Sequence, residues 1–241
     1  MEIKVLGVCG TPVKRKVAKG PTNTEVLLDK ILDSAREQGS DVTTDAIFLG
    51  EDGFCTGCDQ DNWCLLKQSP DRPDKFCSKN DVMSNVYYPK IRDADALVIS
   101  TPVYIGRMSW VTAAFIDRLR ALAEGKLYGF RAPGGSNLKD KVLGVAAVAW
   151  YRHGGVETTL FTTLYCTAGI FGMVPVTAGP SSKATGFGYG AGGMSIGGME
   201  DLANVKNDEY AMLTAQNLGK RVVEMARIIK AGKEALAKGQ A

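Results

Sequence analysis

Five apolar, β-rich runs alternate along the chain with segments of amphipathic, helical pattern. Three of these runs are almost continuously apolar, which is typical of central parallel strands that are buried on both faces. Strands that alternate with helices favour a parallel sheet with right-handed crossovers. The pattern therefore predicts one α/β domain over residues 1–241, with a doubly wound five-stranded parallel sheet and helices on both faces. The expected strands are 3–8, 42–49, 94–100, 141–150 and 171–176, and the expected helices are 24–37, 82–92, 109–124, 156–168 and 208–237.

The composition argues against several classes of protein. The 241 residues are 45% hydrophobic, so the chain can bury a large core without disulfide or metal cross-links. Lys and Arg number 29 against 26 Asp and Glu, and aromatic residues do not interleave with basic runs, so we expect no nucleic-acid partner. The start of the chain lacks a signal-peptide pattern, and no apolar run could span a bilayer. We therefore expect a cytoplasmic protein with no membrane partner.

The glycine-rich stretch 186–198 contains a formal G-x-G-x-x-G, from Gly188 to Gly193. In a dinucleotide-binding fingerprint this motif follows a strand directly, opens a helix and precedes an acidic residue that binds the ribose. The stretch meets none of these conditions. We expect instead a loop over about 180–206, which covers a site or forms a subunit contact.

A loop follows the first expected strand and leads into the first expected helix. It begins with a Gly-Thr-Pro turn at 10–12 and ends with Asn23 and Thr24. Ligands of doubly wound sheets bind beyond the carboxyl ends of the strands, and N–H groups at a helix N-terminus favour a phosphate. The absence of G-K-[ST] argues against a nucleoside triphosphate loop. The loop is therefore a candidate phosphate site, the alternative being that Thr22, Asn23 and Thr24 only cap the helix.

Two further turns follow strands that are expected to be neighbours in the sheet. Residues 102–106 have rigid and glycine positions that can present successive N–H groups edge-on to a flat ring, and Tyr104 supplies an aromatic wall. The second turn contains His153, Gly154 and Gly155. Three loops are thus expected to converge on one site.

Four cysteines lie in an insertion at about 50–80, with the spacing Cys55-x2-Cys58-x5-Cys64-x12-Cys77. In a reducing cytosol, clustered cysteines are more often metal ligands or redox groups than disulfides. Four thiolates suit a cubane iron-sulfur cluster or a tetrahedral zinc ion, although a structural zinc site usually has two tight pairs. A reactive dithiol at Cys55 and Cys58 is a third interpretation, but thioredoxin-like motifs lie directly at a helix start after a strand.

Two other pairs of residues are expected to be structural. Cys9 and Cys166 lie in apolar contexts, where cysteine acts as a small hydrophobic residue, so we expect both to be buried and inert. Asp117 and Arg118 are expected to form a charge pair on their helix or at a subunit contact.

Short motifs occur in a fixed order along nearly the whole chain. They are GTP at 10–12, NT at 23–24, the cysteine cluster, NDVM at 80–83, PVYIGRMS at 102–109, FIDR at 115–118, GGVET at 154–158, DE at 208–209 and LGKRV at 218–222. In this combination the chain resembles the flavodoxin-like NAD(P)H-dependent FMN reductases and, within them, the iron-sulfur flavoproteins. Each motif is weak alone, whereas their order and their placement at strand ends are fairly specific.

The resemblance implies an FMN site. Thr11, Asn23 and Thr24 would hold the phosphate, and two turns would enclose the isoalloxazine ring. His153 is a loop histidine by default, but a donor or cation near the pyrimidine edge would stabilise the reduced anion. The implied ring contacts are Pro102, Val103, Tyr104, Ile105, Gly106, Trp150, His153, Gly154 and Gly155.

The chain departs from the family pattern in several places. Residues 13–20 are an insertion, in which Lys14 and Arg15 are candidate phosphate neighbours. Ala113 and Val82 replace a common Lys and Asp. The four cysteines of the iron-sulfur flavoproteins are more compact than those at 55, 58, 64 and 77. A [4Fe-4S] cluster is the favoured expectation there, ahead of no metal and of zinc.

The resemblance also implies an activity. We expect an FMN-dependent oxidoreductase that takes electrons from NAD(P)H or reduced ferredoxin and passes them to a small-molecule or protein acceptor. The flavin N5 is the reactive centre, so no side chain is needed as a general acid or nucleophile. The alternative is a non-catalytic electron carrier or redox sensor. Family members associate through the cysteine loop and the flavin edge, which predicts a homodimer or homotetramer.

Overall fold

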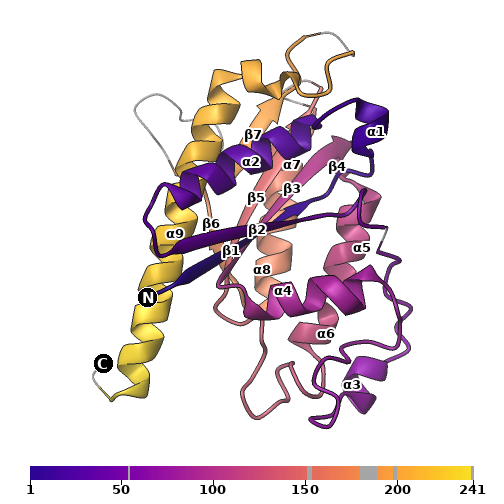
Figure 1. Cartoon of the computed structure of the whole chain (residues 1–241), viewed down its shortest axis with the longest axis vertical. Coiled ribbons are helices and arrows are strands. Elements are labelled where there is room, and N and C mark those ends of the chain that lie inside the picture. The colour runs from indigo at the N-terminus through magenta and orange to yellow at the C-terminus, as the bar shows by residue number, and fades with distance from the viewer. Residues whose placement is uncertain (54, 151–153, 180–188, 198–199, 240–241) are drawn as a thin grey trace.

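A computed structural model describes residues 1–53, 55–150, 154–179, 189–197 and 200–239. Its centre is a parallel sheet with the strand order β2-β1-β3-β5-β6 (Figure 1). The chain reverses direction across the sheet between β1 and β3, which confirms the doubly wound five-stranded arrangement and leaves a crevice at that point. The strands are β1 (Ile3–Cys9), β2 (Val42–Phe48), β3 (Ala96–Tyr104), β5 (Val142–Ala149) and β6 (Val174–Val176).

The central strands are mostly apolar because both of their faces are covered. In β1, Ile3 and Val5 belong to one buried cluster, whereas Leu6 and Val8 belong to the other. Complete burial of such a side chain stabilises the fold by about 1.5–3 kcal/mol. Helices α2 (Asn23–Arg36) and α9 (Glu209–Ala237) pack on the first cluster. The second is covered by α4 (Tyr88–Asp93), α5 (Trp110–Arg118), α7 (Val156–Phe161) and α8 (Thr167–Phe171).

Three of the expected helices are interrupted. Wide π-type turns form at η1 (Met83–Tyr87), before α4, and at η2 (Thr162–Cys166), between α7 and α8. Such turns are frequent at functional sites. The third break lies at Leu119, between α5 and α6 (Arg120–Ala123). Short elements complete the described chain: α1 (Arg15–Ala18), α3 (Trp63–Lys67) and η3 (Asn204–Asn207).

Part of the glycine-rich stretch is a strand, so the expectation of a loop there was wrong. β7 (Ala191–Met194) runs parallel to β5 and pairs with Ala146 to Ala149, beyond the residues that pair with β6. A Cβ atom at Gly193 would lie 2.6 Å from the Cβ atom of Ala211 in α9. Glycine is therefore needed because the strand and the helix approach closely. A second unexpected strand, β4 (Arg107–Met108), pairs antiparallel with β3.

Among the helices of the described residues, none combines the length and the apolar character that a membrane crossing requires.

Candidate functional site

A cavity of about 480 Å³ lies at the carboxyl ends of β1, β3 and β5, beside the start of α2. Its volume falls within the range of small-molecule and cofactor sites, and its position is that of the crevice between β1 and β3. The cavity brings together residues from each of the three converging loops. Of the residues singled out from the sequence, Thr11, Asn23, Thr24, Pro102, Val103, Tyr104 and Trp150 line it.

The N-terminus of α2 forms one wall of the cavity. Thr22 caps the helix, because its hydroxyl accepts from the N–H of Glu25 at 3.4 Å and the carboxylate of Glu25 accepts from the N–H of Thr22 at 3.4 Å. The N–H groups of Asn23 and Thr24 lie in the first turn, where the helix supplies no acceptor. Together with the helix dipole they make this wall suitable for an anion.

The side chain of Asn23 serves a different purpose from the one expected. Its Nδ2 donates to Ser195 Oγ at 3.3 Å, and its Oδ1 accepts from the N–H of Val205 at 2.7 Å. Asn23 thus ties the segment after β7 to the start of α2, and Ser195 becomes part of the cavity wall. This leaves the backbone N–H of Asn23, rather than its amide, as the group available to a ligand.

A buried set of hydroxyl groups fixes the first loop beneath the cavity. Ser109 Oγ donates to the carbonyl of Gly10 at 2.5 Å. Thr112 Oγ1 lies 3.2 Å from the same carbonyl and 3.0 Å from Thr101 Oγ1. A Cβ atom at Gly10 would overlap the hydroxyl of Thr112. The loop is therefore held in one position by α5 and β3.

Tyr104, at the end of β3, and Thr11, in the first loop, both line the cavity. Burial raises the pKa of Tyr104, and the neighbouring Thr11 acts in the opposite direction, so the phenol is protonated at neutral pH.

The turn between β3 and β4 has an unusual backbone. Tyr104 pairs with Arg107, and the two residues between them have positive φ, +49° at Ile105 and +73° at Gly106. Two-residue hairpin turns of this kind favour glycine or asparagine, and a β-branched residue there is strained. Ile105 is also 98% exposed. Backbone strain of this kind persists mainly at functional sites.

Gly155, at the start of α7, packs directly on this turn. It has a φ of +96°, and a Cβ atom there would lie 2.8 Å from Gly106 Cα. Only glycine allows the two backbones to approach so closely. Ile105, Gly106, Gly154 and Gly155 lie outside the cavity lining, and His153 lies outside the described residues.

Sequence reasoning missed half of the cavity. Val148 and Ala149 end β5 immediately before Trp150 and could have been inferred from the strand end. Ser195, Gly197 and Leu202 lie in the stretch 180–206, which was expected to cover a site or form a subunit contact, but none of these residues was singled out. The residues missed are Val13, Thr22, Val148, Ala149, Ser195, Gly197 and Leu202.

Neither Lys14 nor Arg15 lines the cavity. Arg15 forms an ion pair with the buried Glu25, with Nε 2.7 Å from Oε1, and its guanidinium lies 4.7 Å from the ring centre of Phe48. Its charge is therefore balanced within the protein.

The cysteine loop contains four free thiols. Cys55 and Cys64 are buried, whereas Cys58 and Cys77 are half-buried. Burial raises the pKa of Cys55 to about 11, despite the opposing effect of Arg118, and it also raises the pKa of Cys64. Across the residues that the structure describes, no three Cys, His, Asp or Glu side chains come close enough to share a metal ion.

Arg118 holds this loop against the core. Only 2% of Arg118 is exposed, and its guanidinium donates to Asp81 at 2.8 and 3.2 Å and to the carbonyl of Thr56 at 3.0 Å. Cys55 Sγ lies 4.0 Å from the same guanidinium. The partner of Arg118 is thus Asp81, before η1, and not its neighbour Asp117.

The two remaining cysteines differ from each other. Cys9 is buried as expected, and burial raises its pKa to about 12. Cys166 is exposed, so that expectation was wrong. It ends the wide turn η2, where the extra residue changes the helical phase and turns the side chain outward.

A doubly wound sheet with an N–H-lined cavity at its crevice, and without a triphosphate loop, defines the class of flavodoxin-like proteins. The profile of the NADPH-dependent FMN reductase family matches residues 3–185, and the chain belongs to that family. It is therefore a flavin-dependent oxidoreductase.

Two curated relatives match nearly the whole chain. The chain is 29% identical over 230 residues to an iron-sulfur flavoprotein of Methanocaldococcus jannaschii, covering 95% of this chain and 100% of the relative. An iron-sulfur flavoprotein of Archaeoglobus fulgidus is also 29% identical, over 95% and 98% of the two chains.

Two solved structures share the fold at low sequence identity. RosB with a bound riboflavin-phosphate intermediate has a TM-score of 0.64 at 19% identity, over 98% and 86% of the two chains. The NAD(P)H:quinone oxidoreductase of Methanothermobacter marburgensis has a TM-score of 0.57 at 15% identity, over 91% and 96%.

Proposed function

We propose that the 480 Å³ cavity binds FMN with its phosphate at the N-terminus of α2. The observation that carries this proposal is that the first N–H groups of α2 meet the ends of β1 and β3 in one cavity. Thr11 and Thr24 add hydroxyl donors, while Asn23 contributes its backbone N–H. No Lys or Arg of the described residues lines the cavity, so the helix dipole and these donors offset the phosphate charge.

Residues 102–106, of which 102–104 line the cavity, and Trp150 would then hold the isoalloxazine ring. Tyr104 and Trp150 are partly exposed aromatic side chains at the cavity wall, and they would cover the ring and exclude water from it. The bound flavin supplies the electron-transfer chemistry, so this chain provides binding and orientation. His153 as a donor to the flavin stays a prediction.

NAD(P)H is the proposed electron donor, as the family description indicates, and ferredoxin is a second candidate. Protein or small-molecule acceptors and a cytoplasmic homodimer or homotetramer are part of the same proposal. A non-catalytic electron carrier is the alternative. It predicts a stable semiquinone and negligible oxidation of nicotinamide.

A [4Fe-4S] cluster on Cys55, Cys58, Cys64 and Cys77 is the further part of the proposal. It is supported by the names of the relatives and by the four free thiols. The thiol positions described above do not fit a cluster as they stand, because they do not gather at one centre. Uptake would therefore require the loop to close.

The test is an anaerobic purification with a visible spectrum and with parallel iron, sulfide and zinc analysis. Flavin bands that NADPH bleaches rapidly support the proposed function, and about four irons per chain support the cluster. Thr24→Val is expected to weaken FMN binding, whereas Thr43→Val on β2 serves as the control. Protein that never retains flavin contradicts the proposal.

A further inference from the structure

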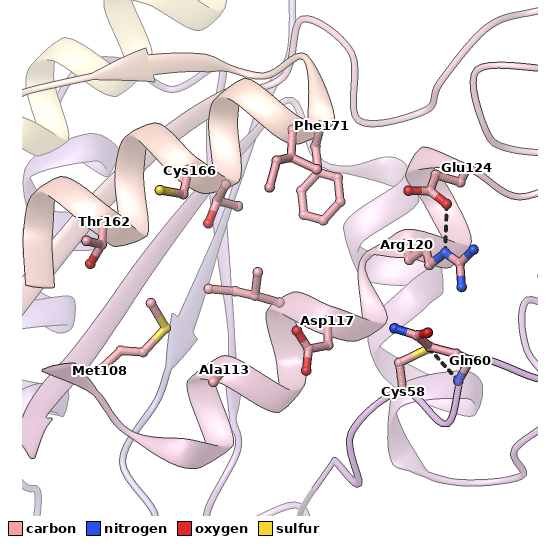
Figure 2. A pocket seen from close by; sticks show the side chains of 13 residues that line it. Cys58, Gln60, Met108, Ala113, Asp117, Arg120, Glu124, Thr162, Cys166 and Phe171 are labelled. Atoms are coloured by element: carbon pink, nitrogen blue, oxygen red, sulfur yellow. Dashed lines mark hydrogen bonds and ion pairs between the residues drawn. The ribbon is translucent and has the colours of Figure 1, made fainter.

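A second cavity, of about 640 Å³, lies between the cysteine loop, α5, α6 and the η2–α8 segment. Figure 2 shows side chains from these elements pointing into one space. Met108 of β4 lines this cavity, and its pairing partner Val103 in β3 lines the flavin cavity. Paired residues of antiparallel strands lie about 5 Å apart. A single strand pair therefore separates the two cavities.

The walls of this second cavity differ in polarity. Its apolar lining includes Met108, Ile116, Ile170 and Phe171, and thus a thioether and an aromatic ring. Both groups make favourable contacts with aromatic rings. Ligand sites typically combine such a surface with a few polar groups that fix orientation.

The polar end of the cavity carries a net negative charge. Arg120 Nε donates to Glu124 Oε2 at 2.7 Å, so these two charges cancel. Asp117 projects toward the cavity between this pair and the apolar lining, and among the described residues it has no partner (Figure 2). A carboxylate in this position disfavours anionic ligands.

The wide turn η2 supplies Thr162 and Cys166 to the cavity. π-type turns inside α-helices are frequent at functional sites. Thr162 and Cys166 of this turn line the second cavity, and no residue of the turn lines the flavin cavity.

We propose that this second cavity binds an uncharged or cationic planar aromatic electron acceptor. The inference rests on the proposed flavin site, because the flavin reduces the acceptor across the β3–β4 pair. For a quinone, two electrons leave the reduced flavin and two protons come from water to give the hydroquinone. The flavin returns its two protons to water, and NAD(P)H reduces it again.

The test compares two probes that share a ring system and resist thiol addition, 2-(hydroxymethyl)anthraquinone and anthraquinone-2-sulfonate. NADPH-dependent reduction of each is measured anaerobically with the flavin-loaded protein, with ferricyanide as a small acceptor that needs no aromatic site. The uncharged probe is expected to have a KM at least 5-fold lower than the sulfonate.

Three variants locate the binding. Ala113→Phe fills the cavity and is expected to raise the KM of the uncharged probe about 10-fold, with ferricyanide reduction unchanged. Asp117→Asn is expected to lower the KM of the sulfonate several-fold. Ile228→Trp changes an exposed residue of α9, away from this cavity, and is the matched control.

The outcomes separate this inference from the proposed function. If NADPH fails to bleach the flavin, the proposed function fails. If bleaching is normal but Ala113→Phe leaves the KM of the uncharged probe unchanged, the second site is overturned. Alkylation of Cys166 adds a direct readout, since the uncharged probe is expected to protect it from N-ethylmaleimide. Cys166 could instead be shielded by a second copy of the chain. If alkylation is then slow without the probe and the probe slows it no further, the inference is also overturned.

Discussion

The flavin cavity and the cysteine loop are built in different ways. The cavity is fixed by many small interactions, such as the hydroxyl groups of Ser109 and Thr112 on the carbonyl of Gly10. The cysteine loop is fixed by two buried side chains: the guanidinium of Arg118 holds its start at Thr56, and the amide of Gln68 donates to the carbonyls of Phe76 and Ala121. Loss of Arg118 should therefore release the start of the loop, whereas the flavin cavity should change only when its backbone is displaced.

The largest effect is expected for Arg118→Met. It removes the guanidinium donors to the carbonyl of Thr56 and to Asp81, whose carboxylate keeps only the N–H of Ser84. Loss of one partner of a fully buried pair costs about 3–5 kcal/mol, and the partial exposure of Asp81 places the expected loss at the lower end of that range. The free energy of unfolding, from urea denaturation, measures the loss. Arg118→Lys retains the positive charge but lacks the planar set of guanidinium donors, so it should recover only part of the lost free energy of unfolding.

Arg120→Met is the matched control, because Arg120 and Glu124 form a partly exposed pair worth about 0–1 kcal/mol. An equal loss in both variants would show that Arg118 has no special role in holding the loop.

The cavity is tested by Gly10→Ala. The added methyl group overlaps the hydroxyl of Thr112, and overpacking of this kind costs about 1–3 kcal/mol. FMN binding should weaken as well, because the first loop moves. Gly134→Ala, where a Cβ atom meets nothing within 4 Å, is the control for both denaturation and flavin titration. Normal FMN affinity in Gly10→Ala would mean that the loop position is not critical.

The pH dependence of the free energy of unfolding tests the buried thiol of Cys9. Burial raises the pKa of Cys9 from 9.0 to about 12, so above pH 9 the unfolded chain loses a proton that the folded protein retains. Stability falls from pH 9 toward pH 12 by about 1.4 kcal/mol per pH unit for this group, and the thiol contributes no slope below pH 9.

Urea denaturation from pH 8 to 10.5 should therefore show a shallower decline in Cys9→Ala than in the unmodified chain. Cys166→Ala, which removes an exposed thiol in place of a buried one, is the control. Identical slopes for all three proteins would contradict a shifted pKa at Cys9.

The smallest effect is expected at the strained turn. Ile105→Gly relieves a left-handed β-branched residue without loss of burial, and the free energy of unfolding should rise by about 0.5–1 kcal/mol. Ile105→Val keeps the strain and should be neutral. If Ile105→Gly is less stable than the native chain, an unseen contact of Ile105 outweighs the strain.

The sequence was most informative where structure follows from periodicity. The five strands and their doubly wound order were predicted because continuous apolar runs such as 141–150 require two covered faces. Thr11, Thr24 and Tyr104 were placed at the cavity for a related reason, since the carboxyl ends of parallel strands converge on one edge.

Prediction failed where tertiary contacts override composition. The sequence of β7 is typical of a glycine-rich loop. Glycine is needed at 193 because the strand packs closely on Ala211, and only the structure shows this contact. The exposure of Cys166 depends on one extra residue in a helical turn. The side chain of Asn23 is used by Val205, 182 residues away, and no local pattern reports such a partner.

The division of the sheet edge into β6 and β7 has a consequence for how this protein can change. Both strands pair with β5, β6 at Val142–Gly144 and β7 at Ala146–Ala149, so each is held in the sheet by its own hydrogen bonds. Since β7 leads straight to Ser195 at the flavin cavity, substitutions in β7 can reshape this wall of the cavity while β6 keeps its own pairing with β5.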